Sequence, residues 1–142
     1  MDALYHLTDP FVAFHLTFIR KTDSEDFWSS YTDNAGHRAW SGYAFEKVCL
    51  AHIGEIKKAL GISGVQTDVS SWISRGSEKR AQIDLVIDRA DRVINLCEIK
   101  FSKGLFEIDR SNDINLRNKI ELFRNETKTM FSVALTSMPR MC

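Results

Sequence analysis

The 142-residue sequence lacks the features that mark disulfide-rich, zinc-binding, membrane-spanning and secreted proteins. It holds three cysteines with neither a CxxC pair nor a Cys/His ligand spacing, which argues against a disulfide framework and a zinc site. No apolar run approaches the ~20 residues of a membrane-spanning helix, and no secretory leader is recognisable. We therefore expect a cytoplasmic protein that makes no contact with a membrane, in which Cys49 and Cys97 are small core residues.

The sequence also has no excess of charge of either sign, because 19 Lys and Arg residues balance 19 Asp and Glu residues. Zero net charge argues against strong nonspecific binding to DNA, which depends on neutralising many phosphates. The charges are unevenly divided, since residues 1–72 carry 6 basic and 9 acidic side chains and residues 73–142 carry 13 and 10. A cation bound to acids of the second half would make its surface more basic, so a phosphate-bearing partner stays open. The motif GxxxxGK followed by Ser or Thr is absent, which excludes ATP binding by a P-loop.

The spacing of apolar residues predicts a mixed α/β domain preceded by a short appendage. Residues 1–35 are expected to form the appendage and linker, with a strand that ends at the helix cap Asp9 and a helix over residues 11–20. Residues 36–142 are expected to form the main domain, with one mixed sheet between helices. Its predicted elements, in the order αβββαβ, are a long helix over 38–60, a strand over 65–75, two strands within 81–101, a helix over 116–127 and a strand over 130–136.

The most informative stretch covers residues 81–101, where two apolar runs, IDLVI and VINLCEI, indicate strands joined by a charged turn at residues 89–91. The sequence places Asp84, Glu98 and Lys100 within these strands. A charge inside a sheet is costly unless it is paired or bound to a metal ion. Three charges in two adjacent strands therefore need an explanation.

A shared cation would explain the two acids if they lie on the same face of the sheet. A hairpin symmetric about Ala90 places Gln82 opposite Glu98 and Asp84 opposite Leu96. Asp84 and Glu98 are then diagonal neighbours with backbones about 7–8 Å apart, within reach of one ion. A slip of one residue would send them to opposite faces, so this interpretation requires a turn of odd length.

Three further residues are candidates for the same site. Glu46 lies at the edge of the buried face of the predicted long helix, and Gly42 one turn earlier leaves open space beside it, so this acid suits a cleft. Arg75 and Lys79 precede the first strand of the hairpin and suit phosphate contacts, although a solvated loop explains them equally well.

An acid on a helix, then Asp84 on one strand and Glu98-x-Lys100 on the next, resembles the PD-(D/E)xK restriction-endonuclease-like superfamily, whose core has the order αβββαβ. The resemblance implies a nuclease site with Mg²⁺ or Mn²⁺, an ion that lowers the pKa of a bound water and stabilises charge on the attacked phosphate. It implies these roles: Asp84, Glu98 and the Ile99 carbonyl as metal ligands, Glu46 as a direct or water-mediated ligand, Lys100 orienting the attacking water, and Gln82 positioning that water or a phosphate.

A second resemblance covers nearly the whole chain. The segments WSGYAFEKVCLAHIGEIKKALGI, AQIDLVIDRADRVINLCEIKFS and LRNKIELF are similar to the C-terminal region of a family of prokaryotic AAA+ ATPases. In that family an ATPase core and a winged-helix segment precede a PD-(D/E)xK-like domain, and YHLTDPF resembles the passage out of the winged-helix segment. Because the family continues with further strand where this chain ends, the resemblance implies a separated or truncated C-terminal piece. Its implied partners are the ATPase and winged-helix region, another chain covering the edge strand, or a second copy.

These observations leave three functional interpretations. The first is a metal-dependent nuclease-like domain that hydrolyses DNA phosphodiester bonds with Glu46, Asp84, Glu98 and Lys100. The second is a catalytically inactive module that binds DNA or protein within an ATPase system, because a fold does not establish an activity. The third is a purely structural network in which the acids and Lys100 pair with one another.

Overall fold

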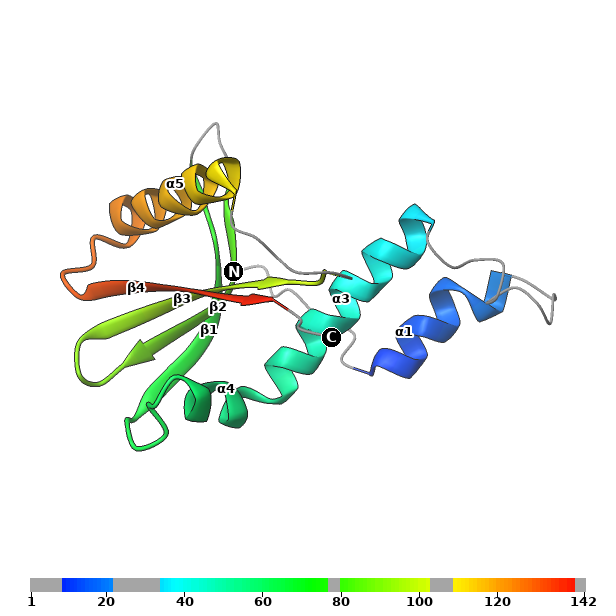
Figure 1. Ribbon diagram of the computed structural model, residues 1–142, viewed down its shortest axis with the longest axis horizontal. Coiled ribbons are helices and arrows are strands. Elements are labelled where there is room, and N and C mark those ends of the chain that lie inside the picture. The colour runs from blue at the N-terminus through cyan, green and yellow to red at the C-terminus, as the bar shows by residue number, and fades with distance from the viewer. Residues whose placement is uncertain (1–8, 22–33, 77–79, 103–108, 140–142) are drawn as a thin grey trace.

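The computed structural model describes residues 9–21, 34–76, 80–102 and 109–139, which form helices around one sheet (Figure 1). No helix in these ranges is both long enough and apolar enough to cross a membrane. Along the chain the elements are helix α1 (Pro10–Thr17), the 3-10 turn η1 (Ile19–Lys21), helices α3 (Ala35–Ala51) and α4 (Ile53–Ala59), strands β1 (Thr67–Ile73), β2 (Gln82–Arg89) and β3 (Val93–Lys100), helix α5 (Arg110–Thr127) and strand β4 (Ser132–Pro139).

The four strands form one mixed sheet in the order β1-β2-β3-β4. Strands β1, β2 and β3 pair antiparallel, whereas β4 runs parallel to β3. A parallel pair needs a long crossover connection, and α5 supplies it between β3 and β4. Within the described residues β4 pairs with β3 alone, so it lies at an edge of the sheet. This layout confirms the prediction of a mixed α/β fold, and from α3 onwards it is close to the predicted αβββαβ order.

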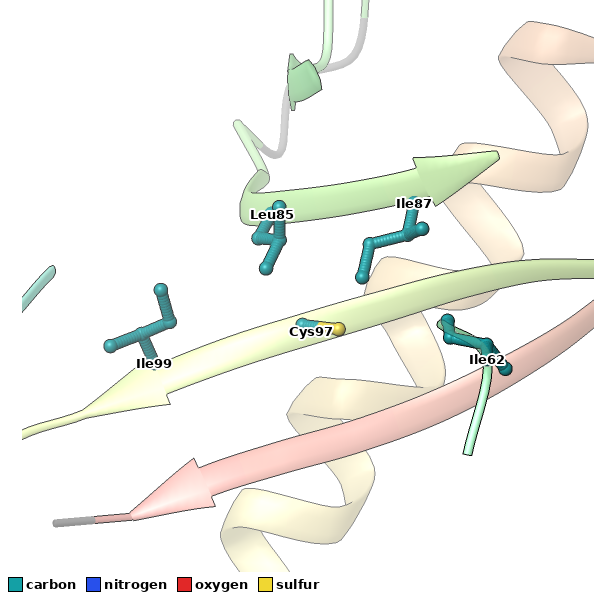
Figure 2. Close-up of a cluster of buried hydrophobic side chains, with 5 residues drawn as sticks. All are labelled: Ile62, Leu85, Ile87, Cys97 and Ile99. Carbon is teal, nitrogen blue, oxygen red and sulfur yellow. The ribbon is translucent and has the colours of Figure 1, made fainter. Parts of the chain in front are cut away.

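One face of the sheet is covered by α3 and α4 (Figure 1). Figure 2 shows the buried cluster on this face, to which β2 contributes Leu85 and Ile87, β3 contributes Cys97 and Ile99, and the segment after α4 contributes Ile62. Apolar side chains of both helices pack against this cluster. The alternation of these residues along each strand fixes which side chains are free to face the other side.

The opposite face is covered by α5 (Figure 1). Here Ile83, Val86 and Leu96 of the sheet are buried with Phe123 of α5, and the ring of Trp72 meets the Phe123 ring edge-on at 5.4 Å between centroids. A sheet buried on both faces has strands that read as nearly continuous apolar runs. This explains the composition of β2 and β3 and leaves their charged residues as the exceptions.

The predicted helix over residues 38–60 is two helices, because the backbone leaves the helical conformation at His52 (φ −110°, ψ 36°). The carbonyl of His52 accepts hydrogen bonds from the N–H groups of Glu55 and Ile56 at 3.0 and 3.2 Å, and these bonds start α4. Apolar spacing continues across the break because α3 and α4 pack on the same face of the sheet. The prediction of a single helix was therefore wrong at His52. The pattern of apolar residues does not specify the backbone conformation of that residue.

Asp9 caps α1 as the sequence predicts, since its Oδ1 accepts hydrogen bonds from the N–H groups of Phe11 and Val12 at 2.8 and 3.1 Å. The helix ends at Thr17, three residues before the predicted end, and continues into the 3-10 turn. Helix α1 lies beside α3 because Phe14 and Phe18 stack against Trp40. The strand predicted before Asp9 lies outside the described residues.

Candidate functional site

The hairpin of β2 and β3 positions the two acids in a register that differs from the predicted one. Leu85 pairs with Cys97, so the hairpin is centred on Asp91 rather than on Ala90. The reason lies in the turn, whose three residues end in Arg92 with φ 63°. A three-residue hairpin loop ending in a left-handed residue is a common geometry, and it moves the centre of the pairing by one residue.

The corrected register changes the neighbours of the acids. The prediction that Gln82 lies opposite Glu98 is wrong, because the partner of Gln82 on β1 is Ile73 and the β2–β3 pairing is shifted by two positions. A shift of two positions leaves Glu98 on the same face of β3 as Leu96, because side chains alternate with a period of two. Continued one pair beyond Leu85, the same register brings Asp84 opposite Glu98. The odd turn length on which the shared-cation interpretation depends is confirmed.

Asp84 lies at an irregularity of β2. The β1–β2 register shifts between the pairs made by Ile83 and Val86, so β2 holds one residue more than β1 at this point. A bulge of this kind redirects side chains, and it explains why Ile83 and Val86, three residues apart, are buried in the same cluster. Asp84 Oδ2 accepts a hydrogen bond from the N–H of Ile99 at 3.0 Å. The carboxylate is thereby attached to β3, one residue after Glu98.

Glu98 is a charged residue inside the sheet, and only 5% of its surface is exposed. Lys119 of α5 donates to both of its oxygens, with Nζ at 2.7 Å from Oε1 and 2.8 Å from Oε2. Lys100 Nζ lies 2.9 Å from Oε1. Two ammonium groups therefore hold one buried carboxylate, which meets the requirement that a buried charge be paired and hydrogen-bonded.

The electrostatics of Asp84 link it to the same group of charges. Burial raises the pKa of Asp84 above its usual 3.8, the hydrogen bond from the Ile99 N–H lowers it, and the negative charge of Glu98 raises it. The ammonium groups of Lys119 and Lys100 lower this pKa to a smaller extent. Asp84, Glu98, Lys100 and Lys119 thus form one electrostatic unit of two negative and two positive side chains. We call these four residues the charge cluster.

The charge cluster fits a hard divalent cation in its donor chemistry. Mg²⁺ accepts one or two protein carboxylates and keeps several waters, so Asp84 and Glu98 with one backbone carbonyl are a sufficient set. Ile99, whose carbonyl is the third predicted ligand, follows Glu98 directly and already bonds to Asp84. Among the described residues, no group of three or more His, Cys, Asp and Glu side chains is placed to hold an ion. A metal here would therefore rest on two carboxylates.

Glu46 is the predicted site residue on α3, the helix that covers the Leu85 face of the sheet. Its negative charge raises the pKa of Cys49, one helical turn later, in addition to the larger effect of burial. Ligation by Glu46, directly or through water, stays a prediction.

The two predicted phosphate contacts lie before β2. Arg75 is exposed, and its backbone N–H donates to Glu126 Oε2 of α5 at 3.0 Å, which fixes the chain here while leaving the guanidinium at the surface. Lys79 lies outside the described residues. A role in binding phosphate stays a prediction for both.

Lys119 is the member of the charge cluster that the sequence analysis missed. The apolar stripe of α5 includes Leu116 and Phe123, and Lys119 lies three residues after the first and four before the second. Positions at these spacings share one face of a helix, so Lys119 lies on the side of α5 that faces the sheet. A lysine at such a position signals a buried charge, and the structure identifies Glu98 as its partner.

Comparison with known proteins places residues 10–119 in a match to the family model DUF234, described as archaeal and bacterial proteins of unknown function. The match covers most of the chain and contains every member of the charge cluster. No curated protein and no solved structure matches the sequence.

Proposed function

The chain belongs to this family of archaeal and bacterial proteins, and from that premise we propose that it is a metal-dependent nuclease-like domain that hydrolyses DNA phosphodiester bonds. One observation carries the proposal: Asp84 and the buried Glu98 lie together at the end of the β2–β3 ladder, with the ammonium of Lys100 at 2.9 Å. Two carboxylates and a lysine on adjacent strands are the groups that metal-assisted attack on a phosphate requires. Stability alone gives a weak reason to bury such a group.

In the proposed reaction Asp84, Glu98 and the Ile99 carbonyl would hold Mg²⁺ or Mn²⁺, with Glu46 as a direct or water-mediated ligand. The bound ion would supply a water of lowered pKa and stabilise negative charge on the phosphate. Lys100 is 48% exposed, so its ammonium is able to leave Glu98 and meet an incoming phosphate. It would orient the attacking water and stabilise the charge that develops on the phosphate oxygens. Arg75 and Lys79 would hold the DNA backbone on the approach to β2.

We place this activity in a restriction-endonuclease-like core and in the C-terminal piece of an AAA+ ATPase-type protein. The order of elements from α3 to β4 supports the first proposal. The edge strand β4 supports a partner, since among the described residues it pairs with β3 alone and its outer backbone groups offer a place for another chain or a further strand. ATP hydrolysis would reside in that partner.

The test is cleavage of plasmid, linear and branched DNA by the purified chain with Mg²⁺ or Mn²⁺. We expect Asp84→Asn, Glu98→Gln and Lys100→Met to abolish cleavage. Asp88→Asn is the matched control, because Asp88 is an exposed acid on the same strand and should keep full activity. Absence of cleavage on every substrate, together with no change of Tm on adding either ion, would refute the catalytic proposal.

A second candidate function is a catalytically inactive module that binds DNA or protein. The observation that favours it is the pairing of both Glu98 oxygens with lysines, which neutralises the carboxylate without an ion. In that case Glu98→Gln would lower the Tm and leave DNA or partner binding unchanged. Under the nuclease proposal the same substitution removes the effect of the divalent ion on the Tm.

A further inference from the structure

We infer that Lys119 is the internal counter-ion of the metal site, which holds Glu98 in the ion-free protein and opposes the binding of a divalent cation. This inference rests on the proposed function, because it assigns a role to Lys119 within the same site. Lys119 is a positioning residue here, since it acts on the metal through Glu98. Its contact with both Glu98 oxygens, at 2.7 and 2.8 Å, is the observation that carries the inference.

The first argument is one of occupancy. A carboxylate has about four lone-pair sites on its two oxygens. Lys119 bonds to both oxygens and Lys100 to one of them, so three of these sites are taken. A cation that coordinates Glu98 therefore competes with the lysines for the same carboxylate.

The second argument is one of space. The cavity beside Glu98 and Lys119, between the sheet and α5, has a volume of about 10 Å³. A cavity of that size holds about one water molecule, so the side chains around the Glu98–Lys119 pair are closely packed and leave Lys119 little room to move away from Glu98. Lys119 is 17% exposed, against 48% for Lys100, so it is the more firmly held of the two cations.

The third argument is the charge of the cluster. Two carboxylates and two ammonium groups sum to zero, and a divalent ion brings the cluster to +2. Like charges a few ångströms apart repel strongly away from bulk water, so the second lysine opposes ion binding. The ion-free protein is thus stable by itself, and its affinity for Mg²⁺ or Mn²⁺ is held down by Lys119.

The experiment measures Mn²⁺ binding to the full chain without DNA, from the EPR signal of free Mn²⁺. We expect Lys119→Met to bind Mn²⁺ at least about tenfold more tightly than the native chain, because one opposing charge is removed. Lys119→Gln should do the same, and it keeps a hydrogen-bond donor for Glu98 in case the methionine variant does not fold. Arg117→Met is the matched control on α5, since Arg117 pairs with Asp113 at the surface, and it should bind as the native chain does.

The outcomes separate this inference from the proposed function. Equal or weaker Mn²⁺ binding in both Lys119 variants, with binding in the native chain that Asp84→Asn abolishes, would overturn the inference and leave the metal site intact. Absence of Mn²⁺ binding in the native chain and in both variants would overturn the metal site itself and the inference with it. Tighter binding in the Arg117 variant as well would reduce the effect to net charge and overturn the specific role of Lys119.

Discussion

Glu98 is the residue whose position stability explains least. It lies in β3 between Cys97 and Ile99, both buried, and two lysines pair with its one negative charge. Replacing a buried ion pair by apolar residues of similar size is often neutral or stabilising, so such a pair is weak support for a purely structural role. The proposal of a metal site gives the acid a use that packing does not supply.

Cys97 offers a test of how tightly β3 is enclosed beside Glu98. Its side chain is fully buried, and burial raises the pKa of the thiol from 9.0 to about 11. Only about one thiol in a thousand would then be ionised near pH 8, and the thiolate is the reactive form. We expect iodoacetamide to label Cys97 roughly 100-fold more slowly in the native protein than in the unfolded one. Mass spectrometry of the digested protein measures this rate.

The raised pKa of Cys97 also makes the free energy of unfolding depend on pH. The pKa of the thiol is higher in the folded than in the unfolded protein, so its contribution to the free energy of unfolding is fully present below pH 9.0 and is lost as the pH rises toward about 11.

Cys49 is the internal control for the labelling experiment, because it is half-buried and should react faster than Cys97. Rapid labelling of Cys97 under native conditions would show that β3 is open, contrary to the burial described here.

At the scale of elements, the end of α4 gives a matched pair of substitutions. Gly61 follows the helix with φ 69°, and an added Cβ would meet nothing, so the only cost of a side chain is conformational. Gly61→Ala should lower the free energy of unfolding by about 1 kcal/mol. Gly54→Ala, inside α4 and also with open space, should raise it by up to about 1 kcal/mol. Urea unfolding measures both, and equal effects would contradict the assigned helix end.

The same helix shows where prediction from sequence succeeds and where it stops. The sequence predicts a helix that ends at residue 60, and the Gly61 that follows adopts positive φ without strain, a property of one residue and its neighbours. The break at His52 is not predicted, because the apolar residues on both sides of it face the same sheet. Local conformational preference is visible in the sequence, whereas a bend imposed by the shape of a packing surface is not.

The candidate site likewise has some features that local sequence predicts and others that depend on tertiary packing. Glu98 and Lys100 are predictable as neighbours on one face because alternation along a regular strand depends on spacing alone, whereas Asp84 lies at a bulge that the spacing does not reveal. The register was misplaced by one residue at its centre because turn geometry at Arg92 decides it. Lys119 is 21 residues from Glu98, and their contact depends on how α5 crosses the sheet. Its one signal was a charge on an apolar stripe, which identifies a buried lysine and does not name its partner.

At the scale of the whole molecule, the charge balance bears on the proposed binding of DNA. Net charge is zero, and the excess of basic residues lies in residues 73–142, where the charge cluster also lies. A chain with no net positive charge has no overall attraction for phosphates, so we expect a shallow salt dependence of DNA binding. A divalent ion shared between protein and phosphate would then supply a large share of the attraction.

We therefore expect DNA affinity to depend on a divalent ion more than on salt. Fluorescence anisotropy of a labelled duplex, with Ca²⁺ in place of the catalytic ion, should give a Kd at least about tenfold lower than with EDTA, since each 1.4 kcal/mol is a factor of ten. Glu98→Gln discriminates between the two sources of attraction. If surface charge alone governs binding, this variant has one negative charge fewer and binds DNA more tightly with or without Ca²⁺. If an ion held by Asp84 and Glu98 governs it, the variant loses the Ca²⁺ effect, and Glu121→Gln, which removes an exposed acid from α5, retains it.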